Sequence, residues 1–227
     1  MTEPALAYLQ DDLAAAGFLL LGGFRPSPGD GVPGISGGAI AQSLLLIGST
    51  GPSLWRPFTS SREFQDGTPH PMDRYSKQKL SRLATVHGLD VLFPFEGPPY
   101  FPFQQWALKC SGFSQSPLGV LAHETYGPWT GFRAAFLSAA PLVEQSPSAN
   151  AGPCETCRDK PCLTACPVNA ISVETGYDVP ACKGHLQKSA EITCWSGCLA
   201  RHACPFGEDH KPHPDNARFH MSSFIGL

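Results

Sequence analysis

The cysteines constrain this chain more than any other feature of its sequence. Nine cysteines among 227 residues fall well short of the ~8–10 % that marks a disulfide scaffold, yet all but one lie between Cys154 and Cys204. In a reducing compartment, clustered thiols hold metal more often than they form disulfides. A local metal site is therefore expected in the C-terminal third, where the spacing is Cys154-x2-Cys157-x4-Cys162-x3-Cys166-Pro167, then Cys182, then Cys194-x3-Cys198-x5-Cys204-Pro205.

Both runs of cysteines end in a Cys-Pro pair, like longer versions of the C-x2-C-x2-C-x3-C-P run of bacterial two-cluster ferredoxins. There the fourth cysteine of each run binds the other cluster. Crossed ligation predicts two 4Fe-4S clusters, the first held by Cys154, Cys157, Cys162 and Cys204 and the second by Cys166, Cys182, Cys194 and Cys198. The alternative is a pair of four-cysteine zinc sites, although those usually show paired C-x2-C knuckles. Cys110 remains, and we expect it to be a small buried apolar side chain.

Composition limits the function classes. With 42 % hydrophobic and 10 % aromatic residues, the chain can bury the core of one large domain, or of a domain plus a small module. A net charge of -3 and only 15 % charged residues leave no basic field for a nucleic-acid backbone. Residues 1–10 contain no Lys or Arg, and the apolar stretch at 18–21 ends at two glycines. We therefore expect no nucleic-acid partner, no secretory signal, no membrane span and a cytoplasmic location.

Hydrophobic spacing and the Gly and Pro positions predict a mixed α+β first half. Helices are expected over 3–16, 71–87 and 104–110, and strands over 18–21, 39–47, 89–93, 118–123 and 132–137. The last two strands are expected to pair across Tyr126-Gly127-Pro128. A Ser- and Pro-rich linker over 141–153 places the domain boundary near residue 148. The four histidines near the C-terminus are expected in a solvated tail, because Pro212 and Pro214 interrupt a helical pattern there.

The C-terminal part resembles a known family. Residues 154–207 carry Cys-Pro-Val-Asn-Ala-Ile at 166–171, the isolated Cys182 and a final Cys-Pro-Phe-Gly, and so resemble the ferredoxin-like domain of epoxyqueuosine reductases. In those enzymes and in reductive dehalogenases, such a module feeds electrons to cobalamin on a preceding flavin-reductase-like (nitroreductase-like) domain. The resemblance implies that residues 1–148 form a cobalamin-binding domain of that fold. Residues 149–227 would then be a ferredoxin-like domain with two 4Fe-4S clusters and a C-terminal tail.

A second resemblance covers residues 112–142, which are similar to the end of the cobalamin-binding domain and to the cobalamin-processing decyanases. Small residues would let backbone groups approach the corrin edge, and aromatic residues would offer it apolar surface, although they could equally be core aromatics. Arg133 matches an arginine that helps hold glutathione in decyanases. The implied cofactor-binding residues are Ser111, Gly112, Ser114, Ser116, Tyr126, Trp129, Phe132 and Arg133.

The sequence also departs from the family. Epoxyqueuosine reductases carry an acidic proton donor where residues 97–110 here hold no Asp or Glu. We also expect neither the helical-repeat tail that would grip transfer RNA nor the Tat signal of dehalogenases. The catalytic residues stay unassigned.

These observations favour an oxidoreductase in which two 4Fe-4S clusters pass electrons from an external ferredoxin or flavodoxin to bound cobalamin. One alternative is an electron-carrier ferredoxin whose first domain serves only for docking. Another is a reductase of an organic substrate above cobalamin, with Tyr100 or Tyr126 as the proton donor.

Overall fold

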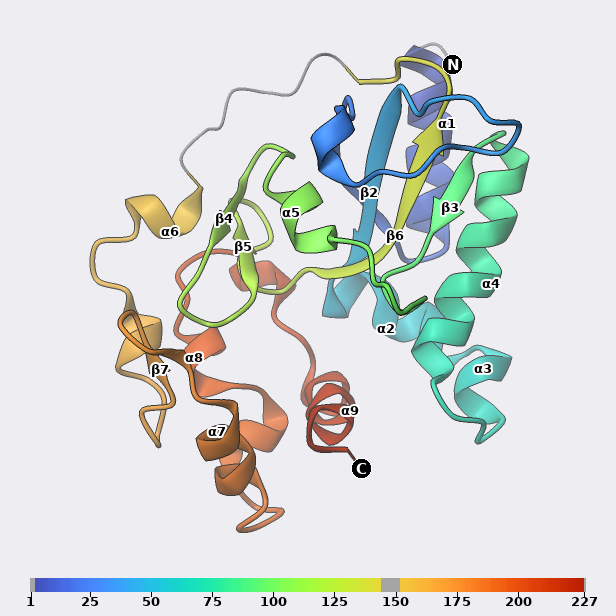
Figure 1. Ribbon diagram of the computed structural model, residues 1–227. Coiled ribbons are helices and arrows are strands. Elements are labelled where there is room, and N and C mark those ends of the chain that lie inside the picture. The colour runs from blue at the N-terminus through green and yellow to red at the C-terminus, as the bar shows by residue number, and fades with distance from the viewer. Residues whose placement is uncertain (1–2, 144–151, 227) are drawn as a thin grey trace. The chain divides into compact units, whose positions relative to one another are not determined.

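The computed structural model describes residues 3–143 and 152–226, which form two compact units (Figure 1). The first unit comprises 3–49, 53–111 and 131–143, and the second comprises 50–52, 112–130 and 152–226. The predicted boundary near residue 148 lies outside the described residues. Residues 112–130 belong with the cysteine segment rather than with the residues on either side of them.

A four-stranded antiparallel sheet in the order β1-β2-β6-β3 forms the centre of the first unit. Its strands are β1 (Leu19–Phe24), β2 (Ser43–Ser49), β3 (Asp90–Leu92) and β6 (Gly131–Ser138). The helices around it are α1 (Glu3–Ala15), η1 (Pro28–Asp30), α2 (Gly51–Thr59), α3 (Arg62–Gln65), α4 (Pro71–Val86) and α5 (Phe103–Ala107). Helix α1 contacts β1, α4 contacts β3 and β6, and the two helices contact each other (Figure 1).

Strand β2 supplies the centre of this core. Every residue of Ser43–Ser49 is buried, and a continuous apolar run of this kind is typical of a strand whose two faces are both covered. Gly48 marks a shift of register between β2 and β6, and a Cβ atom there would lie 2.8 Å from the carbonyl oxygen of Gly131. This close approach of two backbones requires glycine.

The predicted helices α1, α4 and α5 and the strands β1, β2, β3 and β6 are confirmed as element types, with ends that differ by a few residues. Helix α4 ends before Gly88, whose φ of 66° is in the left-handed region that glycine favours. Helix α2 was missed, since Pro57 in its interior interrupts the helical pattern.

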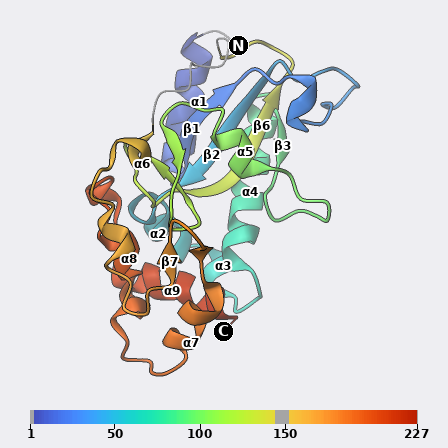
Figure 2. The ribbon, with the colours of Figure 1, turned by 60° about the vertical axis from the view of Figure 1, so that its left-hand side comes forward.

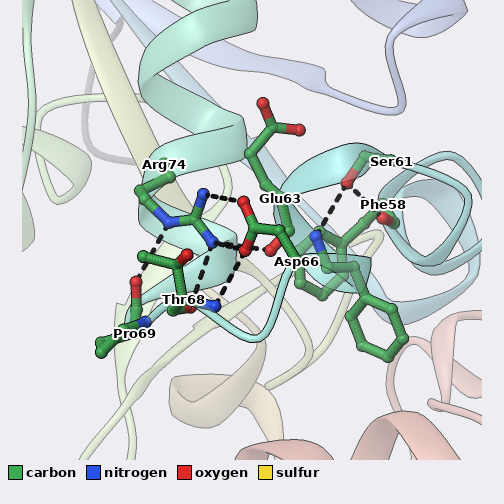
Figure 3. Close-up of polar contacts among 8 residues, drawn as sticks. Phe58, Ser61, Glu63, Asp66, Thr68, Pro69 and Arg74 are labelled. Carbon is green, nitrogen blue, oxygen red and sulfur yellow. Dashed lines mark hydrogen bonds and ion pairs between the residues drawn. The ribbon is translucent and has the colours of Figure 1, made fainter.

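One arginine organises the loop between α3 and α4 (Figure 3). Arg74 donates to both carboxylate oxygens of Asp66, at 2.9 Å and 2.7 Å, and to the carbonyl oxygens of Glu63, Thr68 and Pro69. The Arg74 guanidinium holds the pKa of Asp66 well below its usual range, with a smaller contribution from the Thr68 amide.

The second unit consists of short elements (Figure 2). They are β4 (Phe113–Gln115), β5 (Leu121–His123), α6 (Pro153–Thr156), η2 (Pro161–Leu163), β7 (Ile171–Ser172), β8 (Gly176–Tyr177), α7 (Val179–Leu186), η3 (Thr193–Ser196), α8 (Leu199–His202), η4 (Glu208–His210) and α9 (Pro214–Ile225). Strands β4 and β5 form one antiparallel pair, and β7 and β8 form another.

The predicted pairing of 118–123 with 132–137 is wrong. Strand β5 pairs with β4, whereas β6 pairs with β2 and β3. The turn at 126–128 closes only an isolated bridge between His123 and Gly127. A local turn signal cannot show that the strand after the turn joins another sheet.

The predicted solvated tail is also wrong in part, because residues 214–225 form α9. Pro214 lies in the first turn, where a proline is tolerated, and the His213 side chain accepts a hydrogen bond from the amide of Asp215. Across the described ranges, no helix is both long and apolar enough to cross a membrane.

Candidate metal centre

Four cysteines line one hollow in the second unit. Cys154 and Cys157 belong to the segment of α6, Cys162 lies in η2, and Cys204 follows α8. The hollow is partly open to solvent. Its other walls include the side chains of Ser116, Leu118, Ala122, Lys160 and Phe206. These four are the cysteines of the first predicted set.

Two polar side chains fix the backbone of this hollow. The Ser114 hydroxyl, on β4, accepts a hydrogen bond of 3.1 Å from the amide of Cys154. The Lys160 ammonium donates to the carbonyl oxygens of Cys154 at 2.7 Å and Cys157 at 3.1 Å. Lys160 itself has a φ of 39°, which turns the chain back between the second and third cysteines. The loop geometry therefore depends on a serine and a lysine as well as on the cysteines.

The thiols of this set influence one another. Burial raises the pKa of Cys162, and Cys154, Cys204 and Cys157 raise it further. Burial likewise raises the pKa of Cys204, and the charge of Cys157 adds to the effect. Sulfur atoms that mutually oppose ionisation need a bound cation to become thiolates together.

The other four cysteines form a second neighbourhood of the same unit. Burial raises the pKa of Cys194, and Cys198, Cys182 and Cys166 raise it further. Cys182 and Cys194 pack with Leu186 and Trp195, whereas Cys166 and Cys198 pack with Cys162, Leu118, Ile171 and Ala200. These are the members of the second predicted set. The assignment of both sets as cluster ligands stays a prediction.

Tyr177, on β8, lies within the second set. Its hydroxyl is hydrogen-bonded to Cys182, which opposes the effect of burial on the pKa of that thiol. Burial raises the pKa of Tyr177, and the charges of Cys182, Cys198 and Cys166 raise it further. A neutral tyrosine hydroxyl is thus held as a donor beside these sulfurs.

Neither set of cysteines is arranged as the ligands of a single metal ion. Within 3–143 and 152–226, no three or more His, Cys, Asp or Glu side chains are grouped as ligands of one metal ion. Cys110 lies in the first unit, where it is buried and its thiol donates to the carbonyl oxygen of Trp106 at 3.5 Å. Burial raises its pKa to about 12, which fits the expected inert, apolar role.

The predicted corrin contacts are divided between the units. Ser111, Phe132 and Arg133 belong to the first unit, and Gly112, Ser114, Ser116, Tyr126 and Trp129 belong to the second. In the second unit, the Ser116 hydroxyl donates to the carbonyl oxygen of Val120 at 2.8 Å. The Tyr126 ring stacks on His123, with centroids 4.8 Å apart. The roles of all eight residues toward a corrin stay predictions.

Arg133 lies on β6 of the first unit. Its Nε donates to the hydroxyl of Ser49 at 3.1 Å, and burial lowers its pKa to about 10 while Asp73 opposes that shift. In the same unit, Phe132 stacks with Phe103 at 6.5 Å.

The sequence did not identify three residues of the second unit that lie beside the cysteines: Lys160, Tyr177 and Arg201. Lys160 carries a weak signal in the sequence, as a cation between two closely spaced cysteines. Tyr177 and Arg201 come beside the cysteines only through the fold, so spacing alone could not have found them.

No protein-family model and no curated protein matches the sequence. Solved structures share its fold over nearly the whole chain, among them the following two. The B12-trafficking protein CblC of C. elegans, a homologue of human MMACHC, superposes with a TM-score of 0.55 at 12 % identity, covering 96 % of this chain and 90 % of that one. A selenomethionine-labelled epoxyqueuosine reductase superposes with a TM-score of 0.51 at 15 % identity, covering 93 % of this chain and 67 % of the other. The likeness confirms the α+β fold relationship that the sequence resemblance implied.

Proposed function

We propose that this chain is an oxidoreductase that reduces bound cobalamin with electrons delivered through two 4Fe-4S clusters. The observation that carries the proposal is the hollow lined by Cys154, Cys157, Cys162 and Cys204, which come from three separate segments. When bound, such clusters supply one-electron transfer at potentials set by their surroundings. The shared fold with a B12-trafficking protein and with a reductase supports cobalamin as the substrate.

The hollow suits a group of several atoms better than a single ion. Tetrahedral zinc with bonds of about 2.3 Å would draw four sulfur atoms to within about 3.8 Å of one another. In the described ranges these sulfurs are not gathered as the ligands of one ion. In a 4Fe-4S cluster each cysteine binds a different iron, so the four ligands remain apart.

The residues of the chain have defined parts in this proposal. Ser114 and Lys160 hold the loop of Cys154 and Cys157 in place before the metal binds. Apolar walls such as Leu118 and Phe206 limit the access of water to the sulfurs. Tyr177 donates toward Cys182 in the second set.

The cobalamin side of the proposal follows the sequence resemblance. Residues 1–148 would bind the corrinoid and residues 149–227 would carry the clusters, with the eight predicted contact residues at the corrin. An external ferredoxin or flavodoxin would supply the electrons, in the cytoplasm. Reduction would take the substrate from Co(III) or Co(II) to a lower state and so loosen its upper ligand.

Anaerobic reconstitution tests the proposal. The full chain should take up about eight iron and eight sulfide. Titration calorimetry should then show cobalamin binding, and visible spectra should show its reduction once a strong reductant has reduced the clusters. A matched variant, Cys110→Ala, should keep the full iron content, because Cys110 lies in the first unit and outside both sets.

Each other outcome has a distinct meaning. Zinc in place of iron would overturn the cluster assignment. Full clusters without cobalamin binding would overturn the reductase and leave the electron-carrier alternative. Binding together with turnover of a halide or an epoxide would favour the organic-substrate alternative instead.

A further inference from the structure

Arg201 is a cation placed beside the second cysteine set. It lies in α8, whose N-terminal cap is Cys198, so the two residues are one helical turn apart and share a face. The amide of His202 donates to the carbonyl oxygen of Cys198 at 2.9 Å, which closes this turn. The helix therefore places the Arg201 backbone one turn from one of the predicted ligands.

The environment of the guanidinium is largely apolar. Its Cζ lies 4.9 Å from the centroid of the Trp129 ring, and Trp129 is only 6 % exposed. One Nη donates to the carbonyl oxygen of Pro128. Although Arg201 as a whole is only partly buried, its Nε is shielded from solvent and has no hydrogen-bond partner among the described residues.

Arg201 also lacks a carboxylate partner. In the described part of the chain, the ion pairs involve other cations, namely Arg74, Lys77, His87, Lys109, Lys211 and His213. Burial lowers the pKa of Arg201, and the charge of Cys198 is the largest effect that opposes this shift. A shielded cation without a counter-ion is costly, so an anion is expected where these side chains meet.

We infer that Arg201 is the counter-charge of an anionic iron–sulfur centre held by Cys166, Cys182, Cys194 and Cys198, and that it raises the reduction potential of that centre. The inference rests on the proposed function. Four thiolates around a 4Fe-4S core carry net negative charge, which grows when an electron is added. A fixed positive charge nearby favours the more negative, reduced form, and the effect is large where solvent does not screen it.

The test is a redox titration of the reconstituted full chain, followed by electron paramagnetic resonance. In Arg201→Gln, one of the two midpoint potentials should fall by at least a tenfold change in the reduction equilibrium, which is about 59 mV for one electron. The other should stay unchanged. Arg201→Lys keeps the charge and should restore most of the shift.

Arg218→Gln is the matched control. Arg218 is exposed, and its Cζ lies 5.6 Å from the ring of Trp195, the residue after Cys194. Its charge is thus also close to the second set, but solvent screens it. We expect both potentials of this variant to match those of the wild type.

The outcomes separate this inference from the proposed function. If the wild-type chain takes up no iron, the proposed function fails and the inference fails with it. If both clusters form but Arg201→Gln leaves both potentials unchanged, only the inference is overturned. Loss of one cluster in Arg201→Gln with retention in Arg201→Lys supports a role of charge, whereas loss in both variants shows a role of shape and overturns it.

Discussion

The two units of this chain bury different kinds of side chain. In the first unit, β2 contributes Leu44, Leu45, Leu46 and Ile47, all fully buried, to a core of hydrocarbon side chains. In the second unit, the buried clusters are small and contain Cys162 and Cys194 among their members. The first unit has an extended apolar core to stabilise it, whereas the second, under the proposed function, would gain much of its stability from metal bound to its cysteines.

Removing the iron should show this difference between the units most strongly. We expect anaerobic chelation of the reconstituted protein to raise amide hydrogen exchange throughout the second unit toward the rate of an unfolded chain, since its thiolates then lose the metal that they share. Exchange in β2 should stay slow. Peptide-resolved hydrogen exchange measures both, and equal exposure of the two units would contradict the comparison.

The substitution Cys204→Ala should distinguish the two cysteine sets of the second unit, because only the first set loses a member. Although Cys204 is nearer Cys198 in sequence, it lines the hollow of Cys154, Cys157 and Cys162. We expect iron to fall from about eight to about four per chain, with loss of the first cluster and survival of the second. Iron analysis and electron paramagnetic resonance measure the change. Selective loss of the second cluster would refute the crossed assignment.

A cavity created in the first unit should not change the iron content of the protein. Leu45→Ala removes a fully buried side chain and should lower the free energy of unfolding of this unit by ~2–5 kcal/mol. Urea denaturation gives the loss, and the iron content should equal that of the wild type. Val86→Ala, at a residue that is 66 % exposed, is the control and should change stability by less than about 0.5 kcal/mol. Loss of iron in Leu45→Ala would show that the units are not independent.

The smallest effect is expected at the Asp66–Arg74 pair of the first unit. Arg74 lowers the pKa of Asp66 below its ordinary value of 3.8. The stabilisation is therefore present in full above that value and is lost as the pH falls toward the lowered one. The urea midpoints of Asp66→Asn and wild type should differ slightly at pH 7 and converge below pH 3.8. A difference that grows on acidification would contradict the assignment.

Local patterns in the sequence predicted most of the first unit. The apolar run of β2 and the amphipathic stripe of α4 contain their own signals, and Gly88 ends α4 as expected. The pairing of the strands within the sheet could not be predicted from local patterns. Pairing of β6 with β2 and β3, instead of with the preceding strand, is decided by burial across the whole unit.

The cysteine spacing, by analogy with crossed ligation in two-cluster ferredoxins, predicted two sets of four cysteines, and their assignment as cluster ligands stays a prediction. It gave no information on Ser114, Tyr177 or Arg201. Their positions depend on β4, β8 and α8, whose packing against the cysteines involves contacts between residues distant in the sequence.

The chain passes from the first unit into residues 112–130 and returns through β6 before it reaches the cysteines. Recombination near residue 148 would therefore transfer the thiols but leave behind the hydroxyl that binds the Cys154 amide and the carbonyl that binds Arg201. A C-terminal segment grafted onto another protein would lack this support. The cysteine segment and residues 112–130 should therefore be inherited together, so that substitutions at Ser114 are accepted in descent only alongside changes within the cysteine segment.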